Sequence, residues 1–212
     1  MSRAVLEGTR ADTPKADTPK LSRMAASAGK MTRATGLTGA AGEYFVAAEL
    51  SLRGWLATPT IKNAPGTDVL AQYREKGILV AIQTKTASMG NHFMLNASIE
   101  RPSTASNEWV VLVKLGKLDS HPRFFVLPHD HVAAASYAQH QRWLGTPGKS
   151  GQQHNDTPRR MLLANQFLDY EGQWDLLFQP TTDVPNLLGA DYAECIAQWG
   201  VPEGHPGMPP RT

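Results

Sequence analysis

Two apolar stretches decide the fold of this chain: Gly66-Thr67-Asp68-Val69-Leu70-Ala71 and Ile78-Leu79-Val80-Ala81-Ile82-Gln83-Thr84-Lys85. The polar segment Arg74-Glu75-Lys76-Gly77 between them predicts a turn, so the two stretches are expected to pair as a β-hairpin. Side chains alternate between the faces of a strand, so Gln83 and Lys85 are predicted to point the same way. The hairpin therefore brings a carboxylate, an amide and an ammonium group together at one of its ends.

A helix is predicted just before the hairpin, over residues 42–54. Apolar residues recur there at three- and four-residue spacing, and we expect them to form its buried face: Ala41, Tyr44, Phe45, Ala48 and Leu52. Gly54 suits the left-handed residue that often ends a helix. Two acids lie on this helix, Glu43 and Glu49. Because they are six positions apart, they face different directions, and we expect Glu49 to be solvated.

The order of these features resembles the PD-(D/E)XK nuclease superfamily, in particular its restriction-endonuclease-like and Holliday-junction-resolvase-like branches. A helix with Glu43 comes first, then Asp68 at a strand start, then Gln83-Thr84-Lys85 at the end of an apolar strand. The resemblance implies an α/β, restriction-endonuclease-like fold, with a mixed central β-sheet flanked by helices. It also implies a Mg²⁺- or Mn²⁺-dependent endonuclease that hydrolyses DNA phosphodiester bonds. Two residues depart from the pattern: Thr67 where the family name has proline, and Gln83 where Asp or Glu is usual.

The resemblance also implies a role for each residue of the site. Asp68 would be the central metal ligand, Glu43 a direct or outer ligand, Gln83 a neutral carbonyl ligand, and the Thr84 main-chain carbonyl a fourth. Such oxygen ligands suit Mg²⁺. Lys85 would hold the attacking water or the charge that develops on phosphorus. Taken singly, each of these residues has an ordinary structural interpretation, but their combination favours the catalytic one.

The neutral side chain at position 83 keeps a second function open. In that alternative the chain is a catalytically inactive nuclease-fold protein that binds nucleic acid or a protein partner. A third alternative is an interaction protein without nucleic acid, because the segment after residue 36 is mildly acidic, with fourteen Lys or Arg against sixteen Asp or Glu. The sequence leaves open DNA versus RNA, and also the oligomeric state, with a homodimer as one option.

Composition divides the 212 residues into three parts. Residues 1–36 hold a tandem Asp-Thr-Pro-Lys repeat and seven Lys or Arg against three Asp or Glu, which indicates a disordered basic tail. Residues 37–180 are long enough to bury one core and form the predicted nuclease domain. Residues 181–212 are predicted to be a Pro/Gly-rich extension that wraps the surface or frays.

The chain has neither an apolar run near the ~18 residues that span a bilayer nor the apolar stretch of a secretory signal. We therefore expect a soluble, cytoplasmic protein without membrane contact. The single cysteine, Cys195, excludes an intrachain disulfide and a cysteine-based zinc cluster, and we expect it to serve packing.

Further strands are predicted over residues 55–58, 93–95, 108–115 and 123–127, the third covered on both faces. Asp130 is expected to cap a helix that runs to about Leu144. His129 and His131 are two apart and cannot share a helical face, so a capping and surface role is favoured over a metal pair. Five polar residues could contact phosphates, although such residues usually only solvate a surface: Lys62, Asn63, Arg101, Lys114 and Arg123. Three tryptophans in apolar settings are assigned to core packing instead of base stacking: Trp109, Trp143 and Trp174.

Removal of residues 1–30 is expected to leave the folded domain intact, because this segment has no apolar periodicity with which to join a core. The melting temperature of the truncated protein, compared with that of the full chain by calorimetry, checks this prediction. A decrease of more than a few degrees would show that the segment packs on the domain.

Overall fold

The computed structural model describes residues 35–61, 66–88 and 90–202. The predicted basic tail lies outside these ranges except for its last two residues. Lys62 and Asn63, two of the predicted phosphate contacts, also lie outside them.

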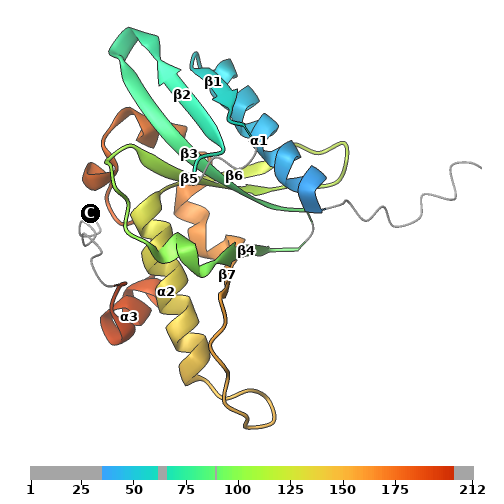
Figure 1. Cartoon of the computed structure of the whole chain (residues 1–212), viewed down its shortest axis with the longest axis vertical. Helices are drawn as coiled ribbons and strands as arrows, with labels where there is room; N and C mark the ends of the chain where they lie inside the picture. Colours follow the sequence, from blue (N-terminus) through green and yellow to red (C-terminus); the bar gives the residue numbers. More distant parts are fainter. Residues whose placement is uncertain (1–34, 62–65, 89, 203–212) are drawn as a thin grey trace, which may run out of the picture. The chain divides into compact units, whose positions relative to one another are not determined.

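A five-stranded mixed sheet forms the centre of the described part (Figure 1). Its strands are β1 (Leu56–Pro59), β2 (Val69–Tyr73), β3 (Ile78–Ala87), β5 (Glu108–Lys114) and β6 (Arg123–Pro128). They lie in the order β1-β2-β3-β5-β6, and among these neighbours β3 and β5 alone run parallel. The expected α/β architecture with a mixed central sheet is confirmed.

The predicted hairpin is confirmed as β2 and β3. A single 3-10 turn, η3 (Arg74–Lys76), joins them, and it ends at Gly77 with a φ of 66°. This left-handed conformation favours glycine, because a side chain there would meet the backbone. The register pairs Val69 with Ile82 and Tyr73 with Ile78, so Asp68 comes just before the first pair.

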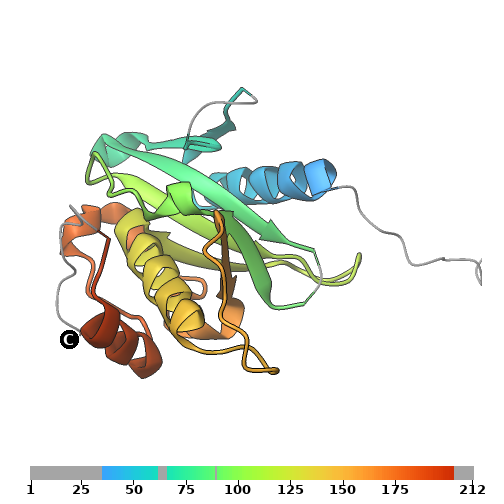
Figure 2. The same ribbon diagram turned by 60° about the horizontal axis from the view of Figure 1, so that its bottom comes forward.

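Helices cover both faces of the sheet (Figure 2). Helix α1 (Thr35–Leu52) packs on one face, and α2 (His129–Gly145) and α3 (Ala190–Trp199) belong to the other side. A two-stranded ribbon of β4 (His92–Asn96) and β7 (Arg159–Leu163) lies on the same side as α2. Short 3-10 segments complete this part: η4 (Ala97–Glu100), η5 (Ala164–Tyr170), η6 (Trp174–Phe178) and η7 (Thr181–Asp183).

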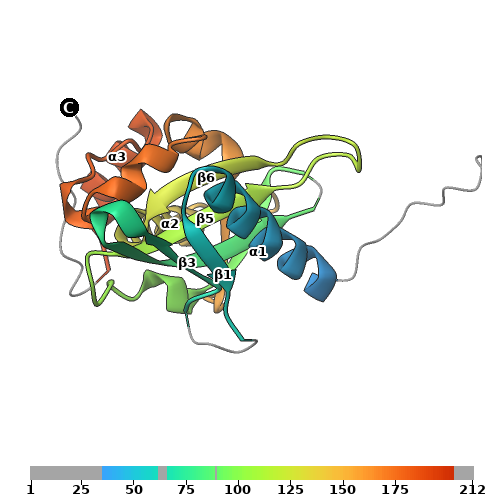
Figure 3. The same ribbon diagram turned by 90° about the horizontal axis from the view of Figure 1, so that it is seen from above.

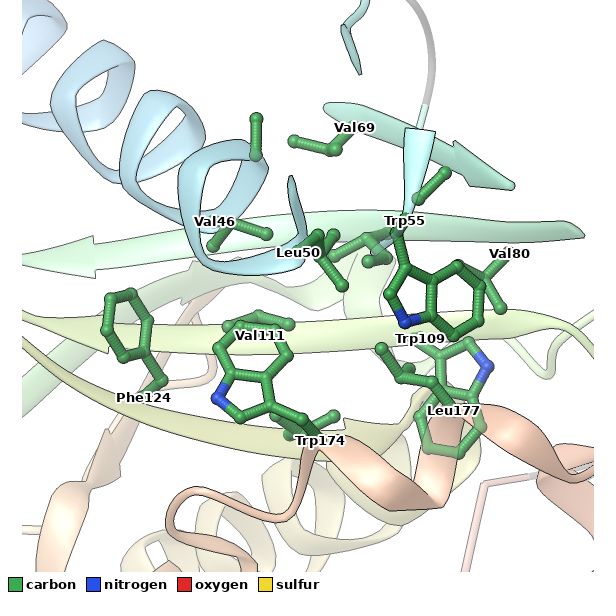
Figure 4. Close-up of a cluster of buried hydrophobic side chains, with 14 of the residues drawn as sticks. Val46, Leu50, Trp55, Val69, Val80, Trp109, Val111, Phe124, Trp174 and Leu177 are labelled. Carbon is green, nitrogen blue, oxygen red and sulfur yellow. The ribbon is translucent and has the colours of Figure 1, made fainter. Parts of the chain in front are cut away.

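Two apolar clusters hold these layers together. The first joins α1 and η6 to the sheet through side chains that include Val46, Leu50, Trp109, Val111 and Trp174 (Figure 4). The second joins α2, α3 and the ribbon to the other face, and the alternate residues of β5 belong to it. Because β5 is buried on both faces, its nearly continuous apolar sequence is explained.

The buried face of α1 differs from the expected one. Tyr44 and Leu52, predicted to join the core, are 67% and 82% exposed. The helix instead buries Gly42, Val46 and Leu50, each four residues after the last, and crosses the sheet on this face (Figure 3). The reason is the close approach at Gly42, where a Cβ atom would overlap the hydroxyl oxygen of Thr86 in β3. Only glycine permits this crossing. The buried face of α1 is therefore determined by the small size of Gly42 and not by the spacing of the apolar residues.

The expectation that Glu49 is solvated is also wrong. Its side chain is only 10% exposed, and its carboxylate pairs with Arg53 one turn later and with His121 Nε2 at 3.1 Å. The ion pairs compensate the burial of the carboxylate. They also connect α1 to the segment before β6.

The segment after residue 180 contributes to the core of the described chain. Leu188 and Tyr192 are buried in the second apolar cluster, and Cys195 is 6% exposed, as its packing role predicted. Burial beside Cys195 raises the pKa of the Tyr192 hydroxyl far above its usual range. None of the described helices combines the length and the apolar character needed to cross a membrane.

Gly42→Ala is expected to lower the melting temperature, because the added methyl group forces α1 away from Thr86. Overpacking of this kind costs about 1–3 kcal/mol of unfolding free energy, or roughly 2–10 °C in a domain of this size. Gly39→Ala is the matched control: it lies in the same helix, and no atom lies within 4 Å of the place that its methyl group would take. Since alanine favours a helix by about 1 kcal/mol over glycine, the control should be stabilised. Equal melting temperatures for both variants would contradict the close approach.

Candidate functional site

The site begins with Asp68, the residue just before β2. Its backbone N–H donates to the carbonyl of Ile82 at 2.8 Å. Its carboxylate Oδ2 accepts a hydrogen bond from the backbone N–H of Thr84 at 2.7 Å. A side-chain oxygen therefore takes the place that a backbone carbonyl has in a regular ladder. This bond holds the acid against Thr84 at the start of β2, where β3 continues beyond its paired residues.

Gln83 and Lys85 lie on the face of β3 that is turned away from α1. They line a cavity of about 450 Å³, together with Gly66. Thr84 points to the α1 side, as the alternation of a strand requires, and is 8% exposed. Its Oγ1 is buried and has no hydrogen-bond partner among the described residues. The predicted orientation of the Gln-Thr-Lys segment is thus confirmed.

A second acid lies on the same face of the sheet. Glu108 begins β5, and the parallel register pairs it with Ala81, two residues before Gln83. Its side chain lines the cavity and accepts a hydrogen bond from Thr104 Oγ1 at 2.5 Å. In the sequence, Glu108 indicates only the start of a strand. Its place could have been found only from the parallel register, which no local pattern specifies.

The segment after η4 supplies a cation. Arg101 is exposed, and it lines the cavity with Lys85 and Pro102. Two residues later, the backbone N–H and the hydroxyl of Ser103 both donate to the Asp130 carboxylate, at 2.8 and 2.7 Å. These bonds fix the segment against the start of α2. Arg101 was one of five scattered candidates for phosphate contact, and the structure brings it to the same cavity as Lys85.

The histidines near the start of α2 are divided between two environments. His129 lines the cavity, and its side chain is 15% exposed. His131 points into the core, where Nδ1 lies 2.7 Å from the Tyr170 hydroxyl. The prediction that they do not share a face is confirmed, but the predicted surface role is wrong. The prediction that Asp130 caps the helix is wrong. Pro128 is the N-cap residue of α2, and Asp130 lies in the first turn, where its carboxylate accepts the hydrogen bond from the Ser103 N–H.

Glu43 is half-buried on α1, next to the close contact of Gly42 with Thr86. Helix α1 packs on the opposite face of β3 from the cavity, and Glu43 is not among the described residues that line it. Its role as a metal ligand stays a prediction. A metal ion bound by both acids would require the Glu43 carboxylate to reach Asp68 around the start of β2.

The donor set fits a hard cation better than a soft one. In the described ranges, no group of three or more His, Cys, Asp or Glu side chains is placed to hold a metal ion. Mg²⁺ does not need such a group, because it usually keeps several waters and binds one or two carboxylates with substrate phosphate oxygens. Asp68 has a second carboxylate oxygen besides the one that accepts from Thr84, and Gln83 precedes Thr84 on β3 and carries an amide oxygen.

Neither a protein-family model nor a curated protein sequence matches the chain. Among solved structures, it is similar to the Holliday junction resolvase Hjc of Archaeoglobus fulgidus, with 16% identity and a TM-score of 0.36 over 61% of this chain and 86% of that one. It is also similar to a bacterial homing endonuclease, with 16% identity and a TM-score of 0.40 over 70% of this chain and 94% of that one. Likenesses this distant carry no argument about chemistry, so the proposed function depends on the geometry of the site itself.

Two substitutions of Asp68 should separate its structural role from its charge. Asp68→Ala leaves the Thr84 N–H without its acceptor, and an unpaired buried donor costs about 1–3 kcal/mol of unfolding free energy. Asp68→Asn keeps an acceptor oxygen and removes the charge, so its stability should stay near that of the parent. Urea denaturation of the three proteins checks this. Equal stability of the alanine variant and the parent would show that the bond does not hold the site together.

Proposed function

We propose that this protein is a metal-dependent endonuclease that hydrolyses DNA phosphodiester bonds in the cavity beside Asp68. The observation that carries the proposal is the hydrogen bond from the Thr84 N–H to the Asp68 carboxylate. It holds an acid against the strand segment that carries Gln83 and Lys85, whose side chains line the cavity, while Asp68 itself is not among the described residues that line it. A strand that served only the core would not need these three polar groups together.

A divalent cation such as Mg²⁺ would polarise the phosphate and lower the pKa of the attacking water. Asp68 would be its central ligand and Gln83 a neutral one. The main-chain carbonyl of Thr84 is a third candidate, since the N–H and C=O groups of a strand residue point to the same side. The Thr84 N–H points to Asp68, so its carbonyl faces the same gap. Glu43 would complete the set from α1.

The cations of the cavity suit a phosphodiester substrate. Lys85 would stabilise the charge that develops on phosphorus, because a fixed ammonium group in a partly enclosed site costs no reorganisation during the reaction. Arg101 would hold a phosphate of the bound strand, with two parallel hydrogen bonds as its planar group allows. His129 lines the same wall and could donate or accept a hydrogen bond there.

The alternative is a catalytically inactive protein with the same fold that binds nucleic acid or a protein partner. Two observations favour it. Gln83 contributes no negative charge, and the carboxylate of Glu108 is engaged by the hydroxyl and the backbone N–H of Thr104. Among the residues that the structure describes, Asp68 would then be the only acid on the sheet at this point that is available to a cation.

Lys85→Ala should abolish Mg²⁺-dependent cleavage of plasmid DNA while changing the melting temperature little. The lysine is partly exposed at a cavity wall, so its loss removes transition-state stabilisation without opening the core. Gln83→Glu restores the usual charge and should tighten Mg²⁺ binding, with activity kept or raised. Cleavage should stop in EDTA for every variant.

Lys117→Ala is the control for the loss of one positive charge, because it lies exposed in the turn between β5 and β6. It should cleave like the parent. Equal cleavage by the parent and by Lys85→Ala would falsify the proposed chemistry. A parent that binds DNA but does not cut it with Mg²⁺ or Mn²⁺ would favour the inactive alternative.

A further inference from the structure

A second cavity, of about 340 Å³, lies on the outer side of the β4–β7 ribbon. Three large side chains with exposed surface line it: Met94 from β4, Met161 from β7 and Trp143 from α2. Their exposed fractions are 59%, 44% and 38%. The sequence predicts a core position for Trp143, and this is wrong, because the ring lies near the end of α2, beyond the sheet. Three exposed side chains of this kind on one wall indicate a binding surface.

The linings of the two cavities come next to each other at one residue pair of the ribbon. Asn96 lines the first cavity and Arg159 lines the second, and the two are register partners across the ribbon. The next pair on the same face is Met94 with Met161. Along α2, His129 of the first cavity and Trp143 of the second are fourteen residues apart, which is about 21 Å of helix, or about six steps of a stacked nucleic-acid strand. A strand with a phosphate in the first cavity therefore needs about six nucleotides to reach Trp143.

The ring of Trp143 is held in a fixed orientation. It stacks on His154 with ring centroids 4.1 Å apart and planes 17° apart, and His140 lies on it at 5.5 Å and 27°. The His140 Nε2 lies 2.7 Å from an Asp156 carboxylate oxygen, and this bond ties the loop after α2 to the helix. The same bond lowers the pKa of the Asp156 carboxyl. Because both histidines already stack on the ring, a ligand contacts the part of Trp143 that stays exposed, and little entropy is lost in ordering that ring.

The two arginines at the second cavity differ in their burial and in their partners. Arg160 is buried and paired with Glu100, so it serves the fold. Arg159 is exposed, and no carboxylate among the described residues pairs with its guanidinium group. An exposed arginine beside a tryptophan and two methionines suits a ligand that is both flat and anionic. A nucleotide combines a flat base with an anionic phosphate, whereas an apolar ligand has no negative charge.

We propose that the second cavity holds an unpaired base of the same strand whose phosphate is bound in the first cavity, so that the enzyme prefers DNA with unpaired nucleotides. This inference rests on the proposed function. In a duplex the faces of the bases are stacked on their neighbours, so a tryptophan at a cavity wall cannot reach them. In an unpaired segment they are free to contact aromatic and arginine side chains. Arg159 binds the phosphate of that nucleotide, while Trp143 and the two methionines contact its base.

Equilibrium binding of a fluorescein-labelled oligonucleotide tests this preference without cleavage. Anisotropy is measured in EDTA for a single strand and for the duplex of the same sequence, with the full-length parent, Trp143→Ala and Arg159→Gln. The parent should bind the single strand more tightly. Trp143→Ala should weaken single-strand binding by several fold and leave duplex binding unchanged, because the contact of the exposed part of the ring with the base is lost. Arg159→Gln should weaken single-strand binding by several fold.

Matched controls are available on other parts of the molecule. Tyr44→Ala removes an aromatic side chain that is 67% exposed on α1, on the opposite face of the sheet. Arg74→Gln removes an exposed arginine in the hairpin turn. Both controls should keep the single-strand affinity of the parent. Melting temperatures identify any variant that fails to fold, and the exposed position of Arg159 keeps its variant informative if Trp143→Ala unfolds.

The outcomes separate this inference from the proposed function. Equal affinity of the parent for single strand and duplex overturns the inference. So does an equal loss for both oligonucleotides in Trp143→Ala, or no loss for either. If plasmid cleavage depends on Lys85 while any of these results is obtained, the proposed function stands and the second cavity has no part in it. A parent that binds neither oligonucleotide also overturns the inference, and plasmid cleavage with Mg²⁺ then decides the proposed function separately.

Discussion

Strand β3 pairs on both of its edges, and the arrangement of the site depends on these two pairings. The antiparallel partner β2 sets Asp68 against Thr84, and the parallel partner β5 sets Glu108 against Ala81. A shift of one residue in either register would turn the affected side chains to the other face. Because the α1 side of β3 is buried by apolar residues, such a shift would also expose the core. The stability of the fold and the geometry of the site are thus specified by the same hydrogen bonds.

One face of β3 is packed against α1, and the other borders the cavity. On one face, Gly42 lets α1 approach so closely that water is excluded. On the other, the sheet near Gln83 and Lys85 is bordered by η4 and the start of α2, which leaves a cavity instead of a packed layer. The polar side chains of Gln83 and Lys85 on that face line the cavity. The Asp130 bonds to Ser103 hold the border in place, so the width of the opening does not depend on a mobile loop.

The charges around the cavity bear on how a cation would bind there. In the proposed site, one acid just before β2 and a neutral amide on β3 would bind a cation more weakly than two acids, so substrate phosphate oxygens would supply part of the ligand set. Such a site would load its cation together with the substrate. A strand that continued past Asn96 and Arg159, as we propose, would gain further contacts away from the reacting phosphate. Binding energy from such remote contacts can position the reacting group.

The sequence by itself determined the local elements: the hairpin with its turn at Gly77, the buried strand β5, and the common face of Gln83 and Lys85. These follow from alternation and turn chemistry, which act over a few residues. The tertiary structure alone decided what depends on distant partners. The buried face of α1 was set by the contact with Thr86, the burial of Glu49 by Arg53 and His121, and the place of Glu108 by a parallel register. Long-range pairings of this kind leave no periodic trace in the sequence, because each is made by residues that are neighbours only after folding.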